Sequence, residues 1–190
     1  MDLVEKYVSE DETVKGIWCV PRFSNPEGKV YSDEVVRRFA NLSPKAKDFR
    51  IFWDNAYAVH ELEEDAPVLL NLMNELRKTG KEDMLFTYTS TSKITFPGGG
   101  LAALGASKNN IELIKNQMSA QTIGPNKINQ LRHIRYFKNL DGVKAHMKLH
   151  AALLRPRFAA VLEELDTIRD LGIAEWTEPK GGYFVSVDLT

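Results

Sequence analysis

"MLFTYTSTSKITFPGGG", residues 84–100, joins an apolar run to a loop of hydroxyl residues, a lysine and glycines. The apolar run at its start is typical of a buried strand. Similar strand-like runs and helical patterns alternate before it, at 16–21, 32–42, 49–54 and 66–80. Alternating strands and helices predict an α/β fold with a mainly parallel sheet.

Capping residues support the two helices in this series. Ser32 is the expected N-cap of the helix over 32–42, because its hydroxyl can accept from a free backbone N–H. The helix over 66–80 is expected to have Pro67 in its first turn and Gly80 as its C-cap.

The second half of the chain continues with a different pattern. Residues 101–107 predict a fourth strand, and Ser107 is expected to cap the helix that follows. Three further features are predicted: a helix from near Pro125, a long helix over 141–170 that Pro156 kinks, and closing strands within 172–179 and 181–190. We expect the two closing strands to begin a small second domain that they cannot complete.

Composition indicates a soluble globular protein. The 190 residues are 43% hydrophobic and 27% charged, with a formal net charge of −1, so no attraction to nucleic acid or acidic membranes is expected. Cys19 is the one cysteine, which excludes an intrachain disulfide, and no run is long enough to span a bilayer. The expected location is the cytoplasm.

Polar residues follow each of the first three predicted strands. Asn25 follows the first strand, Asp54 ends the second with Tyr57 just after it, and Lys93 follows the third. Ligands of open parallel sheets bind beyond the carboxyl ends of the strands, so these side chains are expected to converge on one edge. Each also has a structural explanation when taken alone, as a turn residue, a cap, a packed aromatic ring or a solvated lysine. The ordered combination favours a site.

Pyridoxal phosphate chemistry suits this combination. Lys93 offers the amine that the cofactor aldehyde needs, and Asp54 offers an anion for the pyridine nitrogen. Asn25 and Tyr57 can donate hydrogen bonds to the ring oxygen.

The cofactor phosphate needs hydroxyl and backbone N–H donors. Ser90 and Ser92 supply hydroxyls, and the glycine turn at 98–100 supplies accessible backbone. The sequence therefore predicts a pyridoxal 5'-phosphate site, with no metal.

Three short motifs, "SNPEG" (24–28), "DNAY" (54–57) and "STSK" (90–93), carry a family resemblance. In this order they resemble the second half of a fold-type I, class I/II aminotransferase. The sequence around these motifs is similar to that of a bacterial aspartate-aminotransferase-like group, which is related to the aminotransferase domain of MocR-type regulators. The resemblance covers nearly the whole chain. It implies that residues 1–143 are the C-terminal half of the cofactor-binding large domain, and that residues 144–190 are a linking helix and an incomplete small α+β domain.

The resemblance implies a role for each matching residue. Lys93 becomes the Schiff-base lysine and the base that carries the proton shift, and Asp54 pairs with the pyridinium. Asn25 and Tyr57 bond the ring oxygen, while Ser90 and, less firmly, Ser92 bond the phosphate. The implied activity moves an amino group from aspartate or a similar amino acid to a 2-oxo acid, in a homodimer.

The match also departs from the family. Gly100 and Leu101 stand where many relatives have an arginine on the cofactor phosphate. The arginine that grips the substrate carboxylate has no match in the chain, and nothing before residue 16 matches the upstream phosphate loop or the stacking aromatic residue. We therefore expect a fragment that is inactive or nearly so alone.

Other functions stay open at this stage. One is an aminotransferase-like domain that binds the cofactor as a sensor without turnover, and another is a scaffold fragment that needs a second chain. His146 and His150 have the i, i+4 spacing of metal ligands, but packing or surface roles are favoured because no third ligand is indicated.

Overall fold

The computed structural model describes residues 1–189 and divides into two compact units. The first unit comprises Met1–Pro21, Tyr31–Ala56 and Leu69–Lys127, and the second comprises the remaining described residues. The domain boundary expected at residue 143 refers to a longer protein and stays a prediction.

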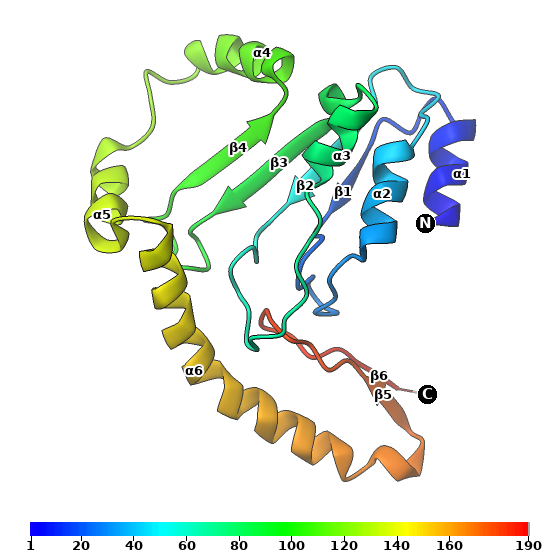
Figure 1. Cartoon of the computed structure of the whole chain (residues 1–190), viewed down its shortest axis with the longest axis vertical. Helices are drawn as coiled ribbons and strands as arrows, with labels where there is room; N and C mark the ends of the chain where they lie inside the picture. The colour runs from blue at the N-terminus through cyan, green and yellow to red at the C-terminus, as the bar shows by residue number, and fades with distance from the viewer. Residues whose placement is uncertain (190) are drawn as a thin grey trace. The chain divides into compact units, whose positions relative to one another are not determined.

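A mixed sheet forms the centre of the first unit. Its strands, in the order β1-β2-β3-β4, are β1 (Gly16–Cys19), β2 (Arg50–Asp54), β3 (Leu85–Ser90) and β4 (Ala102–Ala106). The first three are parallel and confirm the predicted strands, whereas β4 runs antiparallel to β3 (Figure 1). The sheet is therefore mainly parallel, as predicted, with one antiparallel edge.

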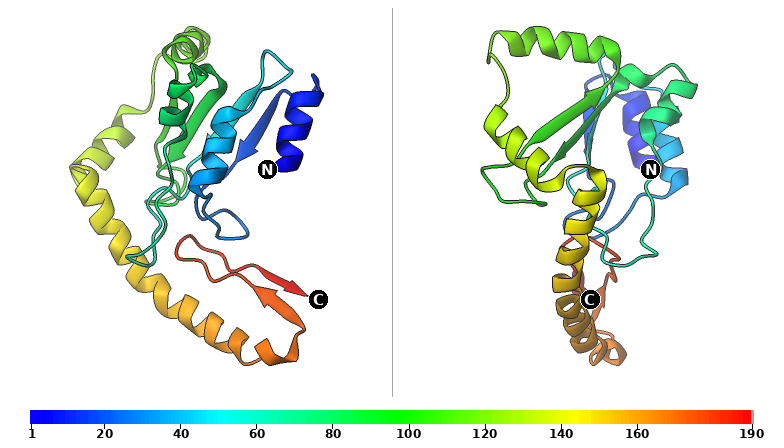
Figure 2. Two further views of the ribbon diagram at one scale, coloured as in Figure 1. Left: turned by 45° about the vertical axis from the view of Figure 1, so that its right-hand side comes forward. Right: turned by 60° about the vertical axis from the view of Figure 1, so that its left-hand side comes forward.

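Helices α1 (Asp2–Glu10), α2 (Asp33–Asn41) and α3 (Leu72–Lys78) pack on one face of this sheet (Figure 2). Side chains along each strand point alternately to the two faces of the sheet. Ile51 of β2 and Leu85 of β3 point to the helices and are almost fully buried. Val36 of α2 and Leu76 of α3 are also fully buried in this cluster. This core fixes the positions of the parallel strands, and therefore the positions of their carboxyl ends.

The capping residues explain where α2 and α3 begin. The Ser32 hydroxyl accepts from the Val35 amide at 3.2 Å, which confirms the predicted cap of α2. The prediction for α3 was wrong in length: Asn71 is its N-cap and accepts from the Asn74 amide at 3.0 Å, so Pro67 lies before the helix. An Asn side chain can accept a hydrogen bond from a nearby backbone amide, and this favours the start of a helix at that residue.

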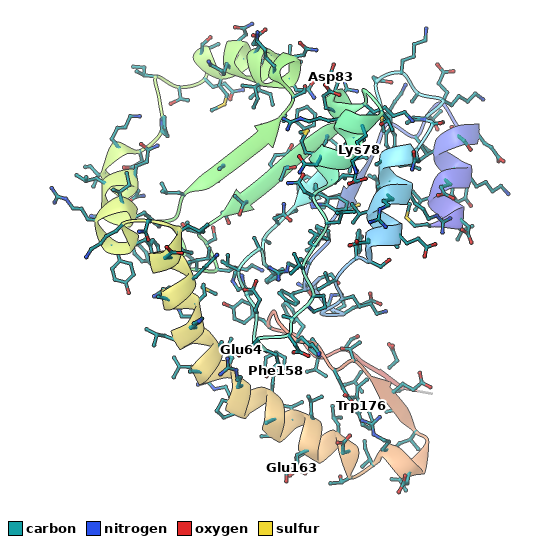
Figure 3. The ribbon with its side chains drawn as sticks, viewed as in Figure 1. Glu64, Lys78, Asp83, Phe158, Glu163 and Trp176 are labelled. Atoms are coloured by element: carbon teal, nitrogen blue, oxygen red, sulfur yellow. The ribbon has the colours of Figure 1, made fainter. Side chains whose placement is uncertain are left out.

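Helix α4 (Lys108–Ser119) follows the edge strand β4. Ser107 accepts from the Asn110 amide at 3.2 Å, as predicted. The buried Asn110 side chain then donates to the carbonyl of Asp83, in the short 3-10 helix η1 (Glu82–Met84), at 2.8 Å (Asp83 is labelled in Figure 3). This bond ties α4 to the segment that leads into β3.

The second unit contains a long helix and a short hairpin. Helix α5 (Lys127–Phe137) leads to α6 (Leu140–Asp166), which continues through Pro156 (Figure 1). After η2 (Arg169–Leu171), the antiparallel pair β5 (Ala174–Trp176) and β6 (Val187–Leu189) confirms the predicted closing strands in shorter form. Thr190, the last residue of the predicted strand, lies outside the described residues.

Cys19 ends β1 and is buried, with 3% of its surface exposed. Burial raises the pKa of its thiol from 9.0 to about 11, partly offset by a hydrogen bond with Tyr31. We expect the native chain to resist a thiol reagent such as DTNB at pH 8, and the unfolded chain to react at once. Because the folded pKa is raised, the stabilising contribution is complete below pH 9 and is lost as the pH rises towards 11. Rapid labelling of the native chain at pH 8 would contradict this buried position.

Candidate active site

The carboxyl ends of β2 and β3 lie side by side. Asp54, the last residue of β2, pairs in register with Tyr88 of β3. The Asn55 amide donates to the Tyr88 carbonyl at 2.8 Å, which extends the pairing one residue past the strand. The Asp54 carboxylate and the loop that carries Lys93 therefore leave the sheet at the same edge.

Asp54 lies on the sheet face opposite the core. Side chains alternate along a strand, so Asp54 shares its face with Phe52, while Ile51 points into the core. The same alternation puts Tyr88 and Ser90 of β3 on the face of Asp54. This face carries a carboxylate and a hydroxyl at its carboxyl edge.

Aromatic rings cover the sheet next to Asp54. The exposed Trp18 ring of β1 stacks on both Phe52 and Tyr88, with centroids 5.6 Å apart and planes 8° apart in each pair. Burial raises the pKa of the Tyr88 hydroxyl. Sequence reasoning missed this aromatic row, although the alternate positions of Phe52, Phe86 and Tyr88 in two strands were a usable signal.

The Lys93 loop is closed at its base by hydrogen bonds between its two ends. The Thr91 amide donates to the Leu101 carbonyl at 2.8 Å, and the Leu101 amide donates to Thr91 Oγ1 at 2.8 Å. Inside the loop, the Ser92 amide donates to Ser90 Oγ at 3.4 Å. Lys93 is exposed on a short turn within this closed loop. The loop therefore carries the Lys93 amine and two serine hydroxyls within residues 90–93.

Gly100 leaves room beside the polar atoms of this loop. A Cβ at this position would lie 3.2 Å from Thr91 Oγ1, 3.5 Å from the Ser92 nitrogen and 3.5 Å from Ser92 Oγ. A larger residue would crowd these hydroxyl and amide groups, which are the donors that a phosphate group needs. The residues present therefore fit a phosphorylated cofactor.

Asn25 belongs to the second unit, on an exposed turn. The Ser24 amide donates to the Lys29 carbonyl at 3.1 Å, and the Gly28 amide donates to the Ser24 carbonyl at 2.6 Å. Gly28 has a φ of +67°, and a Cβ there would lie 2.5 Å from the Pro179 side chain. Only glycine fits this turn. The glycine of the "SNPEG" motif is therefore explained by the turn itself, apart from the chemical role proposed for Asn25.

Tyr57 also belongs to the second unit and is 2% exposed. Its ring makes edge contacts with His60 at 5.5 Å, Tyr183 at 6.1 Å and Phe184 at 6.4 Å between centroids. Burial, and next the neighbouring Tyr57, raise the pKa of the Tyr183 hydroxyl. The Tyr57 ring is therefore fixed by packing on several sides.

Arg22 holds the segment that begins with Tyr57. Its guanidinium donates to the carbonyls of Ala58 and, at 3.0 Å, Pro67, and lies 2.7 Å from the Glu61 carboxylate. A nearly buried guanidinium with several acceptors fixes a loop more firmly than a surface ion pair does.

The predicted site residues thus fall into two groups. Asp54, Ser90, Ser92 and Lys93 come together at one sheet edge of the first unit, and Asn25 and Tyr57 lie in the second unit. The convergence of all six on one site stays a prediction.

The rings of the histidine pair lie close together at a tilted angle. His146 and His150 lie with ring centroids 4.5 Å apart, and His146 Nδ1 is 3.2 Å from the Tyr136 hydroxyl. Within residues 1–189, no group of three or more histidine, cysteine or acidic side chains is arranged to hold a metal ion. In the same described part of the chain, every helix is too short or too polar to cross a membrane.

The mainly parallel sheet with helices on its face, followed by a long helix and a small hairpin, is the architecture of a fold-type I aminotransferase, as predicted. The sequence model of the aspartate aminotransferase family matches residues 1–190. The chain belongs to this family.

Several relatives support this assignment. An aspartate aminotransferase of Corynebacterium glutamicum is 43% identical over all 190 residues. A Mycolicibacterium smegmatis protein that is provisionally described as an aminotransferase is 46% identical over the same length. The crystal structure of an aspartate transaminase from Corynebacterium glutamicum superposes with a TM-score of 0.95, at 43% identity and over 99% of this chain.

These relatives are longer than the chain. The chain spans 44% of the length of both curated relatives and of the crystallised transaminase. This agrees with the expectation that residues 1–190 are a fragment of a longer aminotransferase.

Proposed function

We propose that this chain is the cofactor-holding segment of an aminotransferase that moves an amino group from aspartate, or a similar amino acid, to a 2-oxo acid. One observation carries the proposal: the parallel strands β2 and β3 bring Asp54 and the Lys93 loop to the same sheet edge. The similarity to an aspartate aminotransferase supports aspartate as the amino donor. The homodimer implied by the resemblance, and the cytoplasmic location expected from the composition, are part of the same proposal.

The cofactor of this proposal is pyridoxal 5'-phosphate. When bound, it supplies an aldehyde that condenses with amines and a ring that withdraws electrons from the substrate carbon. The residues described below supply the binding, the orientation and the proton transfer.

Lys93 Nζ is the proposed covalent anchor and general base. Its position on an exposed turn lets the amine reach a ligand, and the closed base of the loop limits how far it moves. After release by an incoming amino group, the neutral amine can take a proton from the substrate carbon and return it to another atom.

Asp54 is the proposed partner of the pyridine nitrogen. A carboxylate at that nitrogen keeps its proton in place, which maintains the electron demand of the ring. The stacked rings of Trp18, Phe52 and Tyr88 lie on the same sheet face as Asp54.

The remaining assignments concern the phosphate and the ring oxygen. Ser90 and Ser92 hydroxyls are the proposed phosphate donors, in the space that Gly100 leaves. Asn25 and Tyr57 are the proposed donors to the ring oxygen, and the packing around Tyr57 would fix the direction of its hydroxyl.

Transfer of an isotopic label tests this function. The chain is incubated with pyridoxal phosphate and 15N-aspartate, and labelled pyridoxamine phosphate is measured by mass spectrometry. We expect stoichiometric labelling above the rate in buffer, without repeated turnover after addition of a 2-oxo acid, because no residue of the chain matches the carboxylate-binding arginine. A chain that holds the cofactor at Lys93 but never converts it would favour the sensor alternative. Full turnover by residues 1–190 would contradict the expectation that this chain alone is inactive or nearly so.

A further inference from the structure

We propose that Thr91 is the positioning residue of Lys93, because its hydroxyl closes the loop that presents the amine. This inference rests on the proposed role of Lys93. Thr91 stands inside the "STSK" motif and was not among the predicted site residues.

Thr91 joins the two ends of the loop through its backbone and its side chain. Its amide donates to the Leu101 carbonyl at 2.8 Å, and its Oγ1 accepts from the Leu101 amide at 2.8 Å. Strand pairing between β3 and β4 ends at Ser90 and Ala102, so this reciprocal pair is the next rung of the ladder. A side-chain oxygen thus takes the place of a backbone carbonyl at the point where the chain leaves the sheet.

The Thr91 carbonyl also organises the turn that contains Lys93. It accepts from the Ile94 amide at 3.0 Å and from the Thr95 amide at 2.9 Å. The Thr95 hydroxyl donates to the same carbonyl at 3.1 Å. Lys93 lies within this turn, so its backbone position follows from that of Thr91.

The hydroxyl is needed because the other half of the loop is intrinsically flexible. Gly98, with a φ of +82°, lies in a run of three glycines. Glycine has more backbone conformational freedom than any other residue type. Without Thr91 Oγ1, the half-buried Leu101 amide would lose its acceptor, and an unsatisfied N–H favours opening of the loop. An open loop would let Lys93 sample many positions, which slows a reaction that depends on its placement.

Two substitutions separate the hydroxyl from the shape of the side chain. Thr91→Val removes Oγ1 and keeps the branched side chain, whereas Thr91→Ser keeps the hydroxyl. Thr79→Val is the matched control, because the Thr79 hydroxyl donates to the Leu76 carbonyl at 3.0 Å in the same unit but away from the loop.

The first measurement is hydrogen exchange of the peptide that contains Leu101, followed by mass spectrometry of the chain without cofactor. We expect Thr91→Val to speed exchange by roughly fivefold, the factor that corresponds to one typical hydrogen bond. Thr91→Ser and Thr79→Val are expected to keep the wild-type rate there.

The second measurement is the rate at which pyridoxal phosphate, fixed by borohydride, modifies Lys93. We expect Thr91→Val to slow this rate by roughly fivefold or more and Thr91→Ser to restore it. Equal rates in wild type and Thr91→Val, or equally slow rates in Thr91→Val and Thr91→Ser, would overturn the positioning role. If wild type is not modified at Lys93, the proposed function of this chain fails, and unchanged exchange in Thr91→Val would separately overturn the loop closure.

Discussion

The Lys93→Ala chain is expected to lose the specific covalent attachment of pyridoxal phosphate completely. Lys93 is the one lysine in the loop between β3 and β4, at the edge formed by β2 and β3. Removal of its Nζ therefore removes the anchor. The conversion of the cofactor with 15N-aspartate should also slow by about 10²–10⁴-fold, the usual contribution of a general base. Absorbance of the bound cofactor and the label transfer described above measure the two effects.

Lys108→Ala is the matched control for this prediction. Lys108 is an exposed lysine in the first turn of α4, in the same unit, and its Nζ lies 4.0 Å from the Glu112 carboxylate. Its replacement should leave the attachment unchanged. Equal loss in both variants, or no loss in Lys93→Ala, would show that the chain reacts as a collection of surface amines.

The Asp54→Ala chain is expected to bind pyridoxal phosphate about 10–100-fold more weakly, because one hydrogen bond to a charged group is worth about 1.5–3 kcal/mol. Asp54→Asn should fall between Asp54→Ala and wild type, since it keeps the shape and loses the charge. Fluorescence titration of the three chains gives the dissociation constants.

Asp48→Ala controls for a general loss of negative charge. Asp48 precedes the same strand and bonds Lys15 at the surface at 2.8 Å, away from the carboxyl end of β2. We expect unchanged cofactor affinity in this variant. An Asp54→Ala chain that binds as tightly as wild type would remove Asp54 from the proposed site.

Much of the fold was predictable because local signals and packing agree. The caps at Ser32 and Ser107 are side-chain hydrogen bonds over a few residues, so the sequence determines them directly. The start of α3 was placed too early because Pro67 is compatible with a first turn, while the Asn71 cap was overlooked. The direction of β4 was not predicted, because a short apolar run has the same pattern in a hairpin as in a parallel crossover.

The site was predictable to the extent that it depends on strand order. Asp54 and the Lys93 loop are adjacent because consecutive parallel strands are neighbours in the sheet. The bond between Thr91 and Leu101 depends on how the loop closes, and no local pattern encodes it. The packing of Tyr57 against Tyr183 joins residues far apart in the sequence, which a single sequence does not reveal.

The central claim is that Lys93 is the amine that binds pyridoxal phosphate, and one experiment on the wild-type chain tests it most directly. The chain is titrated with pyridoxal phosphate under visible absorption, fixed with borohydride, digested, and mapped by mass spectrometry. The account predicts a saturable absorption band and a single modified peptide that contains Lys93. Modification spread evenly over the exposed lysines, without a saturable band, would contradict it.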